Sequence, residues 1–232
     1  MCANIDRHAA AGEPVAVFRA FRCCALDTIT SFCFARNVGA TNAPGFRDPI
    51  ERAMDVALPL TAIFKHFPIV QNILSALPPD VAVFLNPELS GFVNLRKVRS
   101  RLFSGAWNGK LRGGQALDVQ VHDVLHNPDA LAHAPHKTVY HAFLAHEPVP
   151  SEAELRDEAL VYVHAGTDTS SDALAAGTLH VLDSPAIHAR LRAELDAAWP
   201  RLAERPRWED LEALPYLVRP PAISHRRLPR TS

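Results

Sequence analysis

The chain has 232 residues and a mass of 25.4 kDa, which suits one compact domain or part of a larger one. Hydrophobic residues make up 48% of the chain and charged residues 21%, a composition that excludes wholesale disorder. The formal net charge of −1 excludes a strongly basic surface, so nucleic acid is not expected as a partner.

Proline is unusually frequent, with 19 residues against 10 glycines. A chain rich in proline and poor in glycine favours helices that begin and end at prolines over tight β-turns. Aromatic residues account for only 7% of the chain, which argues against an all-β fold. The composition therefore predicts a mainly α-helical protein.

The four cysteines stand at positions 2, 23, 24 and 33, and no pair has C-x-x-C spacing. This pattern indicates reduced thiols rather than a disulfide framework or a structural zinc module. No segment offers about 18 uninterrupted apolar residues, so no membrane span is expected. Asp6 and Arg7 stand where a signal peptide needs an apolar core.

The first predicted helix covers residues 15–34. Apolar residues three and four positions apart mark one face of it, and we expect that face to be buried. These residues are Phe18, Phe21, Ala25, Ile29 and Phe32. Asp27, Thr28 and Thr30 are interpreted as caps and packing residues of the same helix.

Two weaker segments follow. Prolines divide residues 44–87 into short pieces, which predicts short helices and turns. Residues 89–112 predict an amphipathic helix with a basic stripe. That stripe either faces solvent, which is the commoner case, or contacts anionic lipid or a redox partner. It consists of Arg96, Lys97, Arg99 and Arg101.

Residues 113–150 form a polar, histidine-rich connector in which we predict one short helix, at 138–144. Six histidines lie between positions 122 and 146, and His122 and His126 have the i,i+4 spacing of metal ligands on a helix. No acid or cysteine nearby completes a ligand set. Scattered histidines are therefore favoured by about four to one, and no metal site is predicted.

A long helix is predicted at about 152–182. Ser151 and Glu154 have the spacing of a capping box, and acidic residues crowd the first turns, where the helix dipole favours them. No stop signal appears before Asp183-Ser184-Pro185. One face of this helix carries mostly small residues: Leu155, Ala159, Val163, Gly166, Ser170, Ala173, Gly177 and Val181. Such a face permits close approach of another helix or of something flat. Further helices are predicted at 184–198 and 208–214.

The centre of the long helix reads Ala165-Gly166-Thr167-Asp168-Thr169-Ser170. A glycine costs about 1 kcal/mol relative to alanine in a helix, and hydroxyl groups compete for backbone carbonyls. We expect a local helix distortion here, of the kind that often marks a functional site. A small-residue notch for helix packing is an equally weighted interpretation.

The segment 165–170 resembles the central-helix signature of the cytochrome P-450 family, [AG]-G-x-[DE]-T-[TS]. SPAIHARLRAEL (184–195) and WEDLEALPYL (208–217) follow it in the order found in that family. LDTITSFCFARN (26–37) and HKTVYHAFL (136–144) resemble its fungal microsomal branch. The resemblance covers residues 15–217 and implies a partial fold of that family, with residues 1–217 as the family domain and 218–232 as a tail outside it.

The resemblance implies a heme-thiolate monooxygenase that binds dioxygen at iron and inserts one oxygen atom into a small organic substrate. Ala165 and Gly166 would lie against the porphyrin. Thr169 would hold water or bound oxygen, and Asp168 would relay protons. The family also implies an NADPH-dependent reductase as partner, the cytosolic face of the endoplasmic reticulum as location, and, for a fungal member, secondary metabolism. A chain without an anchor would instead be cytoplasmic.

Four family features are expected but not found in the sequence. The heme-ligating cysteine should follow the central helix, but no cysteine follows Cys33. The E-x-x-R helix should follow Leu217, but the chain continues with Pro220 and Pro221, which break a helix. The N-terminal anchor and the helix that contacts a heme propionate are missing as well. The chain is therefore expected to be a catalytically incompetent fragment of the family. The alternative is a non-catalytic helical binding or regulatory protein derived from that scaffold.

Overall fold

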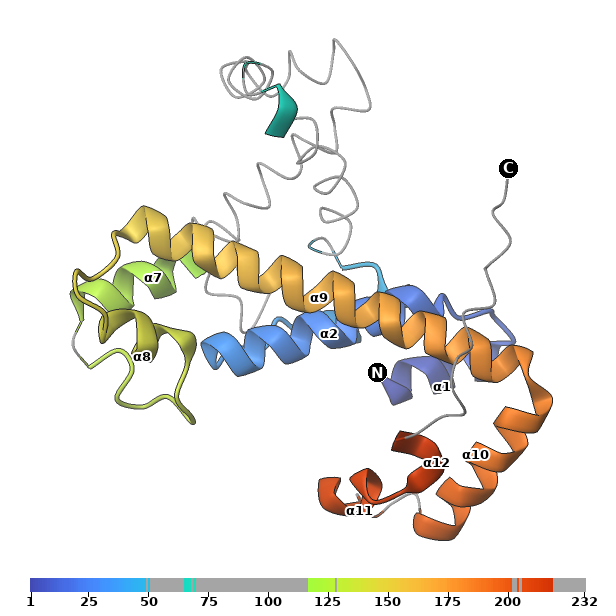
Figure 1. The fold of residues 1–232 in the computed structure, drawn as a ribbon. Coiled ribbons are helices and arrows are strands. Elements are labelled where there is room, and N and C mark those ends of the chain that lie inside the picture. Colours follow the sequence, from blue (N-terminus) through green and yellow to red (C-terminus); the bar gives the residue numbers. More distant parts are fainter. Residues whose placement is uncertain are drawn as a thin grey trace. The chain divides into compact units, whose positions relative to one another are not determined.

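In the computed structural model of the chain, residues 1–48, 117–127, 129–201 and 206–218 are described, together with residues 50, 65–67, 69 and 204. The regular elements in these residues are all helices (Figure 1), which confirms the prediction of a mainly α fold. The helix predicted at 89–112 with its basic stripe lies outside the described residues, as do most of 44–87 and the end of the tail.

The chain divides into two compact units, residues 1–175 and 176–232. The first unit holds α1 (Cys2–Ala11), α2 (Val17–Phe34), the 3-10 turns η1 (Ala40–Asn42) and η2 (Pro44–Phe46), α7 (Leu117–His126), α8 (Val139–Leu144) and most of α9 (Glu152–Asp183). The helices predicted at 15–34, 138–144 and 152–182 are confirmed to within two residues at each end. The sequence analysis did not predict α1 or α7.

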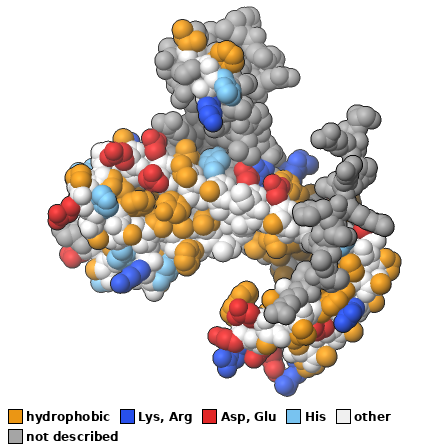
Figure 2. Space-filling view, in the orientation of Figure 1, with side chains coloured by type: hydrophobic (Ala, Val, Ile, Leu, Met, Phe, Trp, Pro, Cys, Tyr) orange, Lys and Arg blue, Asp and Glu red, His pale blue; other side chains and the backbone are white. Residues whose placement is uncertain are grey.

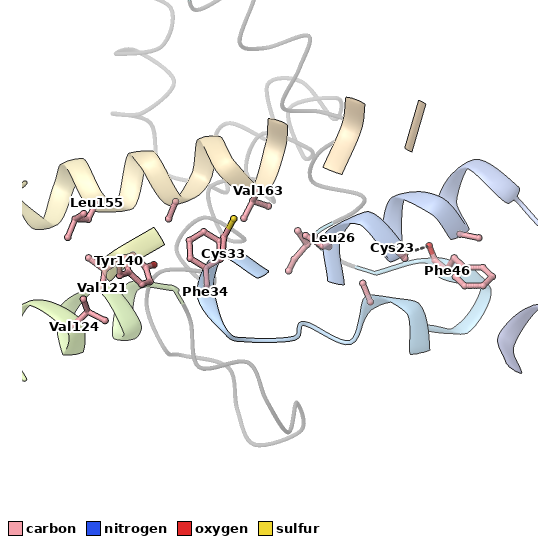
Figure 3. Close-up of a cluster of buried hydrophobic side chains, with 14 residues drawn as sticks. Cys23, Leu26, Cys33, Phe34, Phe46, Val121, Val124, Tyr140, Leu155 and Val163 are labelled. Atoms are coloured by element: carbon pink, nitrogen blue, oxygen red, sulfur yellow. Dashed lines mark hydrogen bonds between the residues drawn. The ribbon is translucent and has the colours of Figure 1, made fainter. Parts of the chain in front are cut away.

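The core of the first unit is one cluster of buried side chains from α2, α7, α8 and α9 (Figure 3). Phe34 and Tyr140 lie at its centre, with ring centroids 5.5 Å apart. Leu26 of α2, Val121 of α7 and Leu155 of α9 are fully buried beside them. The N-terminal half of α9 is therefore held in place by three other helices.

The buried face of α2 differs from the predicted one. Phe18 is 39% exposed and Phe32 is 70% exposed, whereas Cys23, Leu26 and Cys33 are buried. The prediction was wrong at both phenylalanines because polar residues, which a hydrophobic pattern leaves out, share the true buried face. Those polar residues are Arg22, Asp27 and Thr30.

Asp27 is stable in the core because its carboxylate is fully used. Oδ1 accepts a hydrogen bond from the amide of Ala40 at 2.7 Å. Oδ2 accepts from the amide of Thr41 at 3.0 Å and from the Thr41 hydroxyl at 2.7 Å. A buried carboxylate with three donors avoids the desolvation cost of an unpaired charge. Asp27 thereby attaches the η1 turn to α2.

Helix α9 begins as predicted. The Ser151 hydroxyl and the Ser151 amide both donate to Glu154 Oε2 at 2.7 Å, and the Glu154 amide donates back to Ser151 Oγ at 3.3 Å. This capping box satisfies amides that the first turn would otherwise leave unpaired. At 1.5 Å per residue, the 32 residues of α9 extend about 48 Å.

The second unit contains α10 (Pro185–Ala198), α11 (Trp208–Glu212) and α12 (Pro215–Val218). The helices predicted at 184–198 and 208–214 are confirmed, the latter ending two residues earlier than predicted. The Glu194 carboxylate of α10 accepts hydrogen bonds from the amides of Tyr216 and Leu217, at 3.0 and 2.8 Å. The Arg190 guanidinium lies 4.5 Å from the centre of the Tyr216 ring. These contacts attach α12 to α10.

Within the described part of the chain, no helix has the length and apolar character that crossing a bilayer requires.

Candidate functional site

The candidate site is the middle of α9, residues 165–170. The structure has a continuous α-helix here in place of the predicted distortion. The hydroxyls bond within the helix without interrupting it. Thr169 donates to the Ala165 carbonyl at 2.6 Å, and Ser171 donates to the Asp168 carbonyl at 2.9 Å. Both bonds return to the preceding turn of the helix and leave its ladder in place.

One side of α9 is buried against the core of the first unit. Its stripe runs at i,i+4 spacing through Leu155, Ala159, Val163, Thr167 and Ser171. The predicted face follows this stripe as far as Val163 and then departs from it, because Ser170 is exposed. The Thr167 hydroxyl is fully buried and has no hydrogen-bond partner among the described residues. The buried stripe thus changes from apolar to hydroxyl-bearing residues at Thr167, within the signature.

Gly166 lies on α9 directly against Ile29 of α2. A Cβ atom placed on Gly166 would lie 2.6 Å from both Cδ1 and Cγ1 of Ile29, and 3.2 Å from its Cβ. Carbon atoms that are not bonded need about 3.5 Å. The glycine is therefore favoured by helix packing, which is one of the two interpretations that the sequence allowed. Its predicted contact with a porphyrin stays a prediction.

Asp168 lies on the other flank of α9, since residues two apart on a helix point about 200° apart. Its Oδ1 pairs with Arg22 Nε of α2 at 2.8 Å. The Arg22 side chain is 3% exposed and the Asp168 side chain 15%, so solvent screens this ion pair only weakly. Oδ2 of Asp168 is also buried and has no partner within the described residues.

The side of α9 that faces away from α2 is exposed. Ala165 and Thr169 lie on it one turn apart, joined by their hydrogen bond. Val161 and Tyr162 are exposed one turn earlier, at 60% and 37%. Hydrophobic side chains are visible at the surface of the first unit along α9 (Figure 2). Small and apolar side chains on an exposed helix face suit a flat apolar ligand.

The three cysteines of α2 do not supply a heme ligand on that exposed face. Cys23, Cys24 and Cys33 belong to α2, the helix that packs on the buried side of α9. Cys23 and Cys33 are buried, and Cys23 Sγ donates to the Phe46 carbonyl at 3.5 Å. Burial raises the pKa of the Cys33 thiol, which disfavours the thiolate that binds metals. The exposed face of α9 therefore fits one side of a heme, whereas an axial thiolate has no source among these residues.

The structure brings together part of the predicted set and adds two residues to it. Ala165 and Thr169 share the exposed face, while Gly166 and Asp168 contact α2 on opposite flanks. The sequence analysis missed Arg22 and Ile29, which provide those two contacts. For Arg22, the only sequence signal was a charged residue within the apolar run of α2. Ile29 was expected to be buried, but no contact was named for it.

Comparison with known proteins gives the family. The family model described as Cytochrome P-450 matches residues 1–219. The chain is 29% identical over 209 residues to cytochrome P-450 monooxygenase orf3 of Eupenicillium brefeldianum, a match covering 89% of this chain and 38% of that protein. It is 25% identical over 226 residues to the grayanic acid biosynthesis cluster cytochrome P-450 monooxygenase of Cladonia grayi, covering 95% and 39%. It is 28% identical over 217 residues to cytochrome P-450 monooxygenase sdnE of Sordaria araneosa, covering 92% and 40%. The chain spans about two fifths of the length of these curated relatives.

Proposed function

The chain belongs to the cytochrome P-450 family, and from that premise we propose that α9 forms one wall of a heme pocket in a monooxygenase. The observation that carries the proposal is the division of α9 into two faces. One face is covered by α2, while the opposite face exposes Ala165 and Thr169 at the family signature. The family domain is proposed to comprise residues 1–217, and residues 218–232 are proposed to lie outside it.

Heme, when bound, would supply the iron at which dioxygen is activated for insertion into an organic substrate. Ala165 offers a small side chain against which a porphyrin can lie flat. The Thr169 hydroxyl donates its hydrogen to the Ala165 carbonyl, so its remaining lone pairs are available to accept a hydrogen bond from water. Gly166 contributes indirectly, because it lets α2 approach and fix the orientation of α9.

Asp168 is proposed as a proton carrier for water held beside Thr169. A carboxylate next to a hydroxyl can pass protons through one bridging water. Arg22 holds Oδ1 of Asp168 in a fixed orientation, and Oδ2, which is buried without a partner among the described residues, is the oxygen proposed to exchange protons when a water reaches it. Arg22 is therefore a positioning residue in this proposal, because it acts on protons only through Asp168.

The substrate is proposed to be a small organic molecule of fungal secondary metabolism, and electrons would come from an NADPH-dependent reductase. The proposed location is the cytosolic face of the endoplasmic reticulum. All of these follow from the family. The relative from Cladonia grayi is named for a biosynthesis cluster, which agrees with the metabolic context.

These 232 residues by themselves are proposed to be catalytically incompetent. The sequence has no cysteine after Cys33, and burial keeps the Cys33 thiol protonated. To test this, the chain is expressed, mixed with heme, reduced and exposed to carbon monoxide, and the Soret region is recorded. The expected spectrum lacks the thiolate-type band that the relative orf3 would show as positive control. A thiolate-type band from this chain would overturn the proposal.

The role of Thr169 is tested in a hybrid of full family length that carries residues 152–183 of this chain. Thr169→Ala is expected to lower the product formed per dioxygen consumed, because water is no longer held beside Asp168. Ser170→Ala, at the exposed neighbouring residue, is the matched control and should leave that ratio unchanged. If Thr169→Ala also leaves it unchanged, the role assigned to Thr169 is wrong.

A further inference from the structure

We propose that His122, His126 and Glu152 form a binding site for a divalent transition-metal ion of the zinc class. The two histidines lie one turn apart on α7, and Glu152 is the first residue of α9. One ligand atom from each residue lies within 4.8 Å of those from the other two. The sequence spacing did not reveal the third ligand, because the connector and α8 separate Glu152 from the histidines along the chain.

The hydrogen bonding of His126 prepares it to bind a metal. Its Nδ1 lies 2.8 Å from the His122 carbonyl oxygen. A carbonyl oxygen only accepts, so Nδ1 carries the proton and donates it. Nε2 is then the unprotonated nitrogen, with its lone pair free for a metal. Metal-binding histidines commonly donate their other ring N–H to a carbonyl or carboxylate in this manner.

The spacing of Glu152 and His122 also fits shared coordination. Glu152 Oε2 lies 3.6 Å from His122 Nδ1, which is longer than a good hydrogen bond. Two donors that each lie about 2.1 Å from one tetrahedral zinc ion are about 3.4 Å apart. The other oxygen, Oε1, pairs with Arg156, so Oε2 is the oxygen left for a metal.

The two imidazole rings are already neighbours, with ring centroids 4.2 Å apart. Both histidine side chains are exposed and can rotate by the small amount that brings three ligand atoms onto one ion. Two imidazole nitrogens and one carboxylate oxygen are a ligand set that suits zinc, with the fourth position open to water. A bound ion would connect the end of α7 to the start of α9 and close the segment between them.

The test uses Co²⁺ as a coloured substitute for Zn²⁺ on the full chain without added heme. Titration should produce the visible absorption of tetrahedral Co²⁺ with one ion per chain, and Zn²⁺ should displace it. Saturating Zn²⁺, at about a hundred times the dissociation constant, should raise Tm by about 5–10 °C. His126→Ala and Glu152→Gln should each weaken binding at least about tenfold, as expected for loss of a ligand.

His133→Ala is the matched control, because His133 is an exposed histidine of the same connector outside the cluster. It should leave binding unchanged, and circular dichroism of each variant should match that of the parent chain. The proposal is overturned if the parent chain binds no Co²⁺, or if Glu152→Gln binds as tightly as the parent. It is also overturned if His133→Ala costs as much affinity as His126→Ala.

Discussion

Two faces of the same helix, α9, carry similar small and hydroxylated residues but have opposite surroundings. Thr167 is fully buried, and its hydroxyl has no partner among the described residues. Thr169, two positions later, is exposed and donates to the Ala165 carbonyl. Gly166, the residue before Thr167, leaves the space that Ile29 of α2 occupies. The comparison teaches that small residues serve helix packing on one face and stay at the surface on the other.

The largest expected effect comes from removing the ion pair that joins α2 to α9. Arg22→Met removes the cation from a pair that is nearly buried and leaves the Asp168 carboxylate without it. The expected loss is about 3 kcal/mol in the free energy of unfolding, because a buried charge loses its compensation. Urea unfolding measures it.

Arg192→Met is the control for that variant. Arg192 pairs with Asp196 on α10, where the side chains are 65% and 61% exposed. Its loss should cost less than about 0.5 kcal/mol. Equal losses for the two variants would contradict the view that the Arg22–Asp168 pair is shielded from solvent.

The next effect concerns the close approach at Gly166. Gly166→Ala gains about 1 kcal/mol of helix propensity but forces a methyl group against Ile29, at an expected cost of about 2 kcal/mol. The net result is a loss of about 1 kcal/mol in thermal or urea unfolding.

Gly177→Ala, in the same helix, should instead gain about 1 kcal/mol, since nothing lies within 4 Å of the added atom. In an Ile29→Ala background, Gly166→Ala should also become favourable, because the two atoms at 2.6 Å are gone and only the Cβ at 3.2 Å remains. If Gly166→Ala is stabilising in the parent chain, the packing assignment of Gly166 fails.

A smaller effect separates the two threonines. Thr167→Val replaces a buried hydroxyl without a partner by a methyl group, so stability should rise by about 1 kcal/mol. Thr169→Val changes an exposed residue and should stay within about 0.5 kcal/mol. Urea unfolding of both variants measures the difference. A loss of stability for Thr167→Val would show that its hydroxyl has a partner in solution.

The smallest effect concerns the first turn of α9. The hydrogen bond from the Ser151 hydroxyl, followed by that from its amide, holds the pKa of Glu154 below its usual value. A lowered pKa in the folded state means that the contribution is present above about pH 4.5 and is lost as the pH falls through the folded value. The Tm difference between the parent chain and Glu154→Ala should therefore shrink as the solution is acidified from pH 6 toward pH 3. Glu158→Ala is the control variant: it keeps the Ser151–Glu154 cap, so its Tm difference from the parent chain should show no such trend.

Much of the helical framework could be predicted, because it depends on local signals. Ser151 and Glu154 fixed the start of α9, and Pro185 marked the start of α10. The short helix α8 was also predicted, within a polar connector. Where the signal was local chemistry, such as a cap or a proline, the structure agrees with the sequence.

The parts that could not be predicted depend on partners distant in sequence. Arg22 and Asp168 are 146 residues apart in the chain, and neither residue alone indicates that the other is its partner. The buried face of α2 was misassigned at Phe18 and Phe32 because burial of Arg22 and Asp27 depends on their partners. Glu152 likewise meets His122 only after folding.

The central claim is that α2 covers one face of α9 while the opposite face is open to receive heme. Thr167→Cys and Thr169→Cys variants test it through the rate of thiol alkylation, with the label located by peptide mass spectrometry, before and after hemin is added. The account predicts fast labelling at 169, slow labelling at 167, and slowing by hemin at 169 alone. Equal rates at the two positions, or protection by hemin at 167 instead of 169, would contradict it.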